Sequence, residues 1–319
     1  MPVNETLARY SDWSYVSAVS IYVLAILFYL VEQLMTKSKR EVARELAAVG
    51  GGADAPTEAP ARIVVTTSPR AERIGRMGFA LNVLGVLLHA VAVVLRGLAT
   101  DRVPWGNMYE YGSAVCLFAV IGWLYLAKRF DIRRLGMWVL MPIVILLFLG
   151  GTVLYTAAAP VQPALQSYWL AIHVTAVSIA SGLLLLPGVA SLLYLFRAAY
   201  EKDNSRFAKF AARLPKAEVL DRLAYRVTIV GFPLFTFAII CGAIWAESAW
   251  GRFWGWDPKE TTAFVAWVIY AVYLHARATA GWRGSRAAVI NVLGFAAMVF
   301  NLFFINLVTS GLHSYAGVA

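Results

Sequence analysis

Cysteine is scarce in this 319-residue sequence, and its scarcity excludes several kinds of chemistry. Cys116 and Cys241 each stand alone within an apolar stretch, and neither belongs to a CxxC pair. A thiol–disulfide carrier needs two neighbouring thiols, so the chain does not belong to that class. Histidines, cysteines and carboxylates do not cluster at zinc or iron–sulfur spacings either. A phosphate-binding glycine loop and an internal repeat are also not evident.

Charged residues are few as well, at 14% of the sequence, whereas 60% of the residues are hydrophobic and the mean hydropathy is +0.66. Soluble globular chains are nearer half apolar, so this composition excludes them. We predict a multi-span integral membrane protein.

Eight apolar windows each have roughly the 20 residues that a helix needs to cross about 30 Å of hydrocarbon. The first window lacks a basic start and a small-residue cleavage site, so we do not expect a removable signal peptide. The predicted fold is an all-α, polytopic helical bundle of about eight transmembrane helices. The windows are 15–35, 77–99, 108–127, 135–155, 168–196, 225–247, 261–280 and 287–309.

Lysines and arginines gather in alternate loops, which predicts the orientation because cytoplasmic loops hold the excess. Of the 28 basic residues, 23 lie in segments 36–76, 128–134, 197–226 and 277–286. Both termini are therefore expected to be extracytoplasmic in a multi-pass protein of the cell membrane. The net charge of +10 is then mostly a signal of topology, and no nucleic-acid partner is needed to explain it.

Three parts of the chain are expected. Residues 1–36 hold the first helix, 37–76 form a cytoplasmic, partly disordered linker, and 77–319 form a seven-helix core. Within the linker, 41–68 has the Ala, Gly, Pro and Glu-rich composition of a disordered segment. The loop 200–221 mixes basic residues with large apolar ones, so it is either an amphipathic helix on the membrane surface or a solvated connector.

The segment WAESAWGRFWGWDPKE, at 245–260, packs four of the eleven tryptophans into sixteen residues. Rigid aromatic faces bind a large planar ligand by stacking, and charged neighbours fix its orientation. The alternative is an interfacial aromatic belt, but a belt spreads its aromatics over many helix ends. We therefore favour an extracytoplasmic docking loop at 245–261.

The four histidines differ in their expected depth. His173, near the start of its window, and His313, just beyond the last window, share the outer side with the tryptophan-rich loop. His89 and His275 lie within the membrane at depths that differ by about 10 Å, which argues against one shared ligand. An intramembrane histidine indicates function by default, although each could also be a hydrogen-bonded structural residue. Two imidazoles beside an aromatic slot suit the two axial positions of a haem iron, whereas two histidines without a porphyrin would coordinate a metal poorly.

Four motifs together resemble one family. WGRFWGWDPKET at 250–261 looks like the "WWD" loop of haem-handling cytochrome c assembly proteins. VPWGNMYE at 103–110, LQSYWLAIHV at 165–174 and GLHSYA at 311–316 extend the match. The chain resembles the CcsA/ResC family of the System II pathway, often labelled CcsB in actinobacteria.

The resemblance implies that His173 and His313 are the axial ligands of haem b at an outer site, and that His275 is the ligand of a transmembrane site. It implies a ResB/CcsB-type partner, apocytochrome c as acceptor, and thiol-reducing proteins acting indirectly. Together with its partner, the chain would be a holocytochrome c synthase, or haem lyase, that transports haem and attaches it to a CxxCH motif. His89 remains a candidate haem contact within the membrane.

Further site residues follow from the same loops. We expect a haem platform and a pair of propionate-binding cations, although the cations could instead cap and solubilise the loop. Residues at the start of the third window would line the slot or contact the partner, while Trp105 and Trp169 are expected in the aromatic belt. The platform is Trp250, Trp254, Trp256 and Asp257, the cations are Arg252 and Lys259, and the third-window residues are Asn107, Tyr109 and Glu110.

Two other functions remain open. A haem exporter would need the same sites but no docking of apocytochrome, so co-purification of apocytochrome would separate it from a synthase. A b-type electron carrier ranks last, because no window here holds the two histidines that such carriers place on one helix.

Overall fold

The computed structural model describes residues 3–38, 65–66, 68–130, 132–161, 165–203, 208–279, 281–309 and 311–313. These residues are helical apart from loops and one two-residue antiparallel pair, β1 (Lys37–Ser38) with β2 (Val65–Thr66). The predicted all-α bundle is therefore confirmed. The helices are α1 (Glu5–Met35), α3 (Pro69–Thr100), α4 (Met108–Phe130), η1 (Arg133–Leu135), α5 (Gly136–Thr152), α6 (Tyr168–Asp203), α7 (Ala208–Ala211), α8 (Ala217–Trp250), α9 (Pro258–Ala278) and α10 (Ser285–Val308).

Among the described residues, seven helices are long and apolar enough to cross a membrane: α1, α3, η1 with α5, α4, α6, α8 and α10. The predicted window 261–280 corresponds to α9, which has 21 residues, packs along α10 and α8, and is not among these seven. Its first turn carries Lys259 and Glu260, and its last turn carries His275 and Arg277.

Helix boundaries shift where local capping decides them. α3 begins at Pro69, ahead of the window predicted at 77, because the Ser68 side chain accepts a hydrogen bond from the backbone N–H of Ala71 and proline occupies the first turn. Of the segment 41–68, which was predicted to be disordered within the linker, only 65–66 and 68 are among the described residues. In the stretch 200–221, the described residues hold the end of α6, the four-residue α7 and the start of α8, so the amphipathic-helix alternative is reduced to α7.

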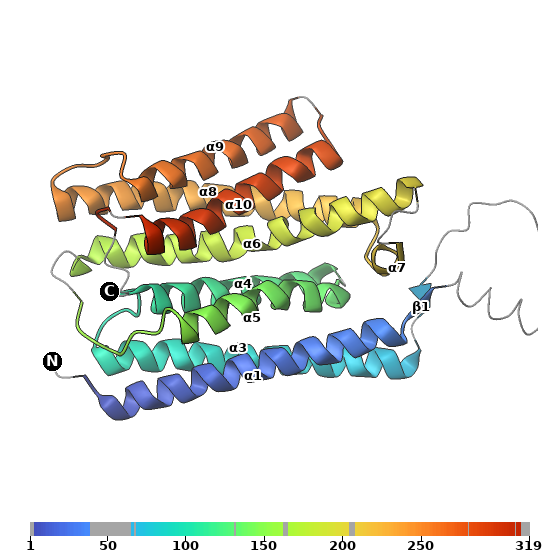
Figure 1. Ribbon diagram of the computed structural model, residues 1–319, viewed down its shortest axis with the longest axis horizontal. Helices are drawn as coiled ribbons and strands as arrows, with labels where there is room; N and C mark the ends of the chain where they lie inside the picture. The colour runs from blue at the N-terminus through green and yellow to red at the C-terminus, as the bar shows by residue number, and fades with distance from the viewer. Residues whose placement is uncertain are drawn as a thin grey trace, which may run out of the picture.

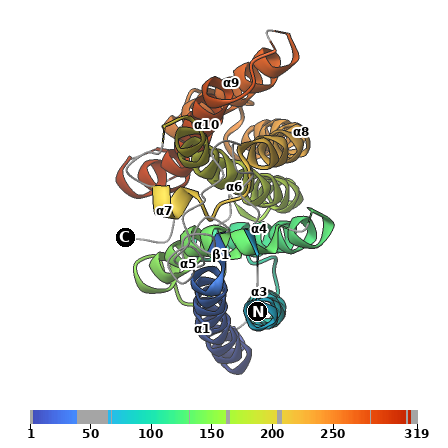
Figure 2. The ribbon, with the colours of Figure 1, turned by 90° about the vertical axis from the view of Figure 1, so that its right-hand side faces the viewer.

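The helices form an elongated bundle in which α1 and α3 lie on one side, α9 lies on the other, and α4, α5 and α6 lie between them (Figure 1, Figure 2). The start of α1 meets the end of α3, where the Asn4 N–H donates to the Ala99 carbonyl at 2.9 Å. We call the end of the bundle that carries loops 101–107, 153–161, 251–257 and 309–313 the tryptophan-loop end. The sequence predicted that these loops share one side.

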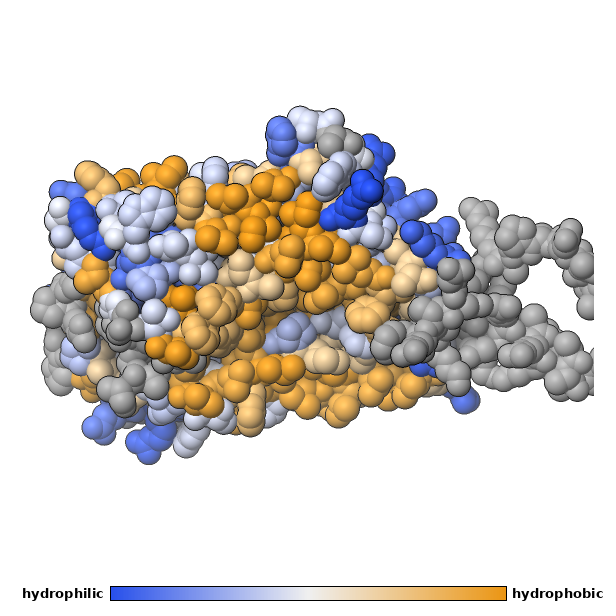
Figure 3. Space-filling view, turned by 45° about the horizontal axis from the view of Figure 1, so that its top comes forward, coloured by the Kyte–Doolittle hydropathy of each residue, from blue (hydrophilic) through white to orange (hydrophobic). Residues whose placement is uncertain are grey.

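Large apolar side chains cover the outside of the bundle along its length, and polar side chains gather toward the ends (Figure 3). On α1 and α3, for example, Val16, Leu27, Leu87 and Val94 are exposed. A soluble protein rarely exposes an apolar surface this continuous. The chain is a multi-pass membrane protein.

Candidate functional site

A large cavity opens at the tryptophan-loop end, between α4, α6, α8, α9 and α10. It encloses about 1440 Å³ of space, part of it open to solvent. Its lining is mainly apolar and aromatic, with a few polar groups near the loops.

His173 and His313 both line this cavity, as the sequence predicted for a shared site. His173 comes from the second turn of α6, and His313 follows α10. Each imidazole centroid lies 6.0 Å from a ring centroid of Trp245, so the two imidazoles are within twice that distance of each other. His173 and His313, which are 140 residues apart in the sequence, therefore both contact the Trp245 side chain.

Each of these histidines is oriented through its Nδ1 atom. The His173 Nδ1 lies 2.8 Å from the carbonyl oxygen of Ala238, and the His313 Nδ1 lies 2.8 Å from Oδ2 of Asp257. A carbonyl or an ionised carboxylate can only accept a hydrogen bond, so both Nδ1 atoms donate. The lone pair of each neutral imidazole is then on Nε2, which is the arrangement that outer acceptors impose on metal-ligating histidines.

Gly242 leaves the space that the His173 ring occupies. A Cβ atom at this position would lie 2.7 Å from Cε1 of His173 and 2.9 Å from its Nδ1. Because carbon atoms pack at about 3.5–4.0 Å, any larger residue would displace the ring. Helix α8 thus sets the position of His173 in two ways: the Ala238 carbonyl accepts its hydrogen bond, and Gly242 has no side chain to displace its ring.

Asp257 joins the tryptophan loop to the end of the chain. It caps α9, its Oδ1 accepts the backbone N–H of Leu312 at 2.8 Å, and its Oδ2 accepts from His313. Burial alone would raise the pKa of this carboxyl, but the hydrogen bonds from Leu312 and His313 outweigh it and hold the pKa below its usual value. Burial and the nearby Lys259 ammonium lower the pKa of His313, which favours the neutral imidazole.

Four tryptophans line the cavity: Trp105, and from the tryptophan-rich segment Trp245, Trp250 and Trp254. Trp245 is fully buried and stacks on His173 with an interplanar angle of 7°. The predicted platform left Trp245 out, although it belongs to the same tryptophan cluster. Trp256, which was predicted, is 64% exposed, has a positive φ of 57° and is not among the lining residues.

The two predicted propionate contacts behave differently. Arg252 pairs with Glu260 at 3.1 Å and lies over the Trp250 ring, and it does not line the cavity. This arrangement fits the alternative in which the arginine stabilises the loop. Lys259 lines the cavity, with its ammonium 5.9 Å from the Tyr111 ring centroid.

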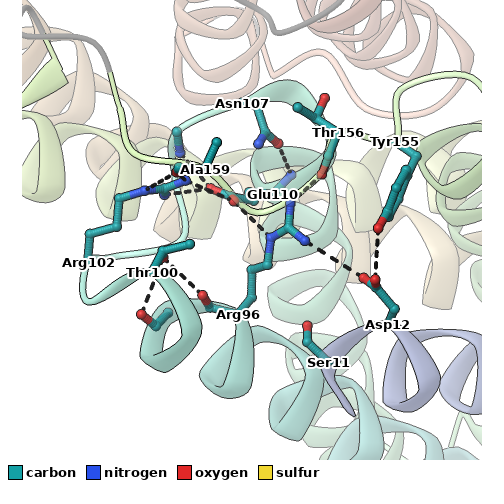
Figure 4. A network of polar contacts seen from close by, with 12 residues as sticks. Ser11, Asp12, Arg96, Thr100, Arg102, Asn107, Glu110, Tyr155, Thr156 and Ala159 are labelled. Carbon is teal, nitrogen blue, oxygen red and sulfur yellow. Dashed lines mark hydrogen bonds and ion pairs between the residues drawn. The ribbon is translucent and has the colours of Figure 1, made fainter. Parts of the chain in front are cut away.

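The residues at the start of α4 divide between the cavity and a buried network. Asn107 lines the cavity and caps α4 by accepting the N–H of Glu110 at 2.9 Å. Tyr109 and Glu110 are buried and do not line the cavity, and Glu110 forms ion pairs with Arg96 and Arg102 (Figure 4). Trp105, expected in an aromatic belt, instead lines the cavity and donates from Nε1 to Oγ1 of Thr175 at 3.2 Å.

Trp169, also expected in the belt, is partly buried and packs beside Leu165, Leu170 and Trp245. It is not among the residues that line the cavity.

The two remaining histidines lie elsewhere. His89 is fully buried and does not line the cavity; its Nε2 is 2.9 Å from Oγ of Ser113 and its Nδ1 is 3.4 Å from the Tyr22 hydroxyl. These partners fit the structural role that the sequence left open. His275 is exposed on α9, one turn from the end opposite the tryptophan loop.

Comparisons with known proteins agree with the four motifs. A family profile described as Cytochrome C assembly protein matches residues 105–313. The chain is 32% identical over 257 residues to the cytochrome c biogenesis protein CcsA of Guillardia theta, with 75% of this chain and 85% of that protein covered. It is 34% identical over 260 residues to CcsA of Mesostigma viride, with coverages of 73% and 85%.

Among solved structures, the chain resembles Cytochrome c Heme Lyase CcmF with a TM-score of 0.62 at 17% identity, over 99% of this chain and 49% of that one. At this identity the likeness supports the fold alone. The family profile and the CcsA relatives show that the chain belongs to the CcsA family of cytochrome c assembly proteins, multi-pass membrane proteins of cytochrome c biogenesis.

Proposed function

We propose that the chain binds haem b as a substrate in this cavity, with His173 and His313 as the axial ligands, and presents it to apocytochrome c. The observation that carries the proposal is the shared geometry of the two histidines. Both donate from Nδ1 to a fixed acceptor, both keep the lone pair on Nε2, and both lie against Trp245 in one cavity. Neutral imidazoles oriented in this way are the usual axial ligands of haem iron.

The lining of the cavity suits a porphyrin. Trp245, Trp250 and Trp254 offer flat apolar faces, and most of the lining residues from α4, α6 and α10 are apolar. Lys259 supplies a cation at the wall, where a propionate would pair with it. Arg252 acts on the loop instead, since its guanidinium is engaged by Glu260.

The contribution of this chain to attachment is positioning. In the reaction, each of two cysteine thiols of CxxCH adds across a vinyl group, so that one S–C bond forms and the thiol hydrogen passes to the other vinyl carbon. Holding reactants in attack geometry is worth roughly 7–11 kcal/mol of barrier. We propose that the tryptophan loop holds the porphyrin edge where the thiols reach it, while the histidine of the acceptor replaces one axial ligand.

His275 suits a second haem position shared with another protein. It is exposed on the flank of α9 rather than turned into the bundle. A single histidine there would need a partner's histidine to complete two axial positions. We therefore propose that a ResB/CcsB-type protein covers this flank, and that haem passes from this site to the cavity.

The test is the reduced absorption spectrum of the full chain purified with its partner, compared with His173→Ala and His313→Ala. We expect either substitution to remove the low-spin bis-histidine signal of the cavity haem and added imidazole to restore it. His89→Gln is the matched control, because His89 does not line the cavity. We expect the spectrum of this variant to equal that of wild type. Unchanged spectra in both alanine variants would remove this ligand pair.

An assay for thioether formation on an apocytochrome peptide distinguishes a synthase from an exporter. A CxxCH peptide added to the haem-loaded complex should acquire two thioether bonds in wild type and none in His313→Ala. Release of free haem without any thioether product would support the exporter.

A further inference from the structure

Two loops at the tryptophan-loop end have the same construction. Loop 101–107 follows α3 and loop 251–257 follows α8, and each begins with a left-handed residue, Asp101 at φ 49° or Gly251 at φ 71°. Each ends with an Asn or Asp that caps the next helix, Asn107 for α4 and Asp257 for α9. The loops have equal length, and all of these positions are 150 residues apart.

A carboxylate in the following helix fastens each loop. Glu110 accepts from Arg102 at 2.8 Å and from the Gly106 N–H at 2.8 Å. Glu260 accepts from Arg252 at 3.1 Å and from the Gly255 N–H at 2.9 Å. We call each set, Arg102 with Asn107 and Glu110, and Arg252 with Asp257 and Glu260, a loop clamp.

The likeness extends through the helices. α3, α4 and α5 begin at 69, 108 and 136, and α8, α9 and α10 begin at 217, 258 and 285, so the starts correspond within two residues at a shift of 150. Helix α1 packs on α3 and α5, as α6 packs on α8 and α10. The chain is built from two four-helix units, α1 with α3–α5 and α6 with α8–α10. This correspondence is an internal structural repeat, which is not evident in the sequence alone.

A small second pocket in the first unit corresponds to the main cavity in the second. Shifted by 150, seven of its lining residues fall on seven residues that line the main cavity. Where the second unit has Ala246, the first has Arg96, whose side chain is buried and pairs with Glu110 at 3.0 Å. Arg96 therefore occupies space in the first pocket that the second unit leaves open at Ala246. Its residues are Ala92, Val93, Arg96, Pro104, Tyr109, Glu110 and Ser113, and their counterparts are Gly242, Ala243, Ala246, Trp254, Lys259, Glu260 and Ala263.

The first clamp nevertheless serves the main cavity. Loop 101–107 places Trp105, Gly106 and Asn107 on the cavity wall formed by the first unit. Arg102 also donates to the Ala159 carbonyl at 2.9 Å, and Arg96 donates to that of Thr156, so the same network holds the segment that follows α5 (Figure 4).

We infer that Glu110, through its clamp on loop 101–107, is a positioning residue for the haem cavity, the counterpart in the first unit of Glu260 in the tryptophan loop. The inference rests on the proposed function of the cavity. The first unit has only a small pocket of its own but has the same clamp, and so it supplies one wall while the second unit supplies the ligand His173 and the tryptophan loop.

The test compares Glu110→Gln and Glu260→Gln in the full chain with its partner, using hydrogen exchange and haem binding together. We expect Glu110→Gln to speed exchange in a peptide spanning 101–110 but not in one spanning 251–260, with the reverse for Glu260→Gln. Both variants should weaken haem binding about tenfold, the lower end of the effect of residues that orient metal ligands.

Glu32→Gln is the matched control, since Glu32 is fully buried and pairs with Arg133 at 2.8 Å at the opposite end of the bundle. It should lose stability without changing haem affinity or exchange in either loop. Arg102→Gln is a milder second variant in case Glu110→Gln does not fold, because Glu110 keeps Arg96 and Gly106 as partners.

Wild-type affinity in both Glu110→Gln and Arg102→Gln, or an equal loss in Glu32→Gln, would overturn the positioning role. These results stay distinct from a failure of the proposed function, which would appear as haem binding that is insensitive to His173→Ala and His313→Ala.

Discussion

Replacing Gly242 with alanine adds one methyl group against the His173 ring, and it tests whether that ring is a haem ligand. The new Cβ would lie 2.7 Å from Cε1 of His173. Carbon contacts need about 3.5–4.0 Å, so the imidazole must move by about 1 Å. The same shift would stretch the 2.8 Å hydrogen bond between the His173 Nδ1 and the Ala238 carbonyl beyond hydrogen-bonding distance.

Two effects on stability oppose each other in this variant. Alanine is favoured over glycine within a helix by roughly 1 kcal/mol, while overpacking costs about 1–3 kcal/mol. The protein should therefore fold with a loss of about 0–2 kcal/mol. Haem affinity should change far more, by about 10–100-fold, because disturbing the group that orients a metal ligand typically costs that much.

Gly112→Ala is the matched control. Gly112 also lies within a helix, α4, but nothing would come within 4 Å of its added Cβ. It should gain stability without any change in haem binding. The assay is titration of the full complex with reduced haem, followed by absorbance, alongside thermal unfolding. If Gly242→Ala bound haem with wild-type affinity and spectrum, the assignment of His173 as an oriented ligand would be refuted.

Three further predictions follow from the same cavity. Asp257→Ala should weaken haem binding by about 10–100-fold, while Asp257→Asn, which still accepts a hydrogen bond and caps α9, should lose less; equal losses in a haem titration would contradict the orienting role. In the haem-free protein, Asp257 and His313 both have lowered pKa values. Each group therefore binds fewer protons in the folded state than in the unfolded state. Their stabilisation is thus present above the unfolded pKa of His313, 6.5, and is lost as pH falls through the lower folded values, which exchange of the Leu312 amide would follow. Ala246→Arg places in the cavity the residue that the first unit has at the equivalent position, Arg96, and should abolish haem binding. Ala278→Arg, on the exposed far end of α9, is the control and should bind haem normally. The measurement is the haem content per chain.

The sequence predicted the pairing of His173 with His313 because topology alone brings those positions to one end of the bundle. It did not predict which tryptophans face the cavity. Trp245 lies on the last turns of α8 and Trp256 in an irregular loop, and only the rotation of the helix and the positive φ of Trp256 decide that the first is buried and the second exposed. Local spacing carries no such information.

Local sequence patterns also could not predict hydrogen-bond and ion-pair partners that lie on other helices. The role of His89 depends on Ser113 and Tyr22, which α4 and α1 bring to it. Arg252 meets Glu260 only because the loop folds back between them. The sequence alone does not indicate the repeat, because at matching positions the two loops share only an Arg, an Asn or Asp, and a Glu. The structure shows that these residues form the same ion pair in both loops.

The comparison of the two units separates what the fold provides from what side chains decide. Both units place a helix end, a seven-residue loop and a capped helix start around a pocket, and both fasten the loop with the same clamp. The frame therefore does not determine which unit binds a ligand. Small residues at Gly242, Ala243 and Ala246 leave the second pocket open, whereas Arg96 and Tyr109 fill the first and are stabilised there by Glu110 and the aromatic contacts of Tyr109. The second unit thus leaves open the space in which we propose that haem binds, at a cost in packing, and the first unit fills most of the equivalent space and supplies a wall of the cavity.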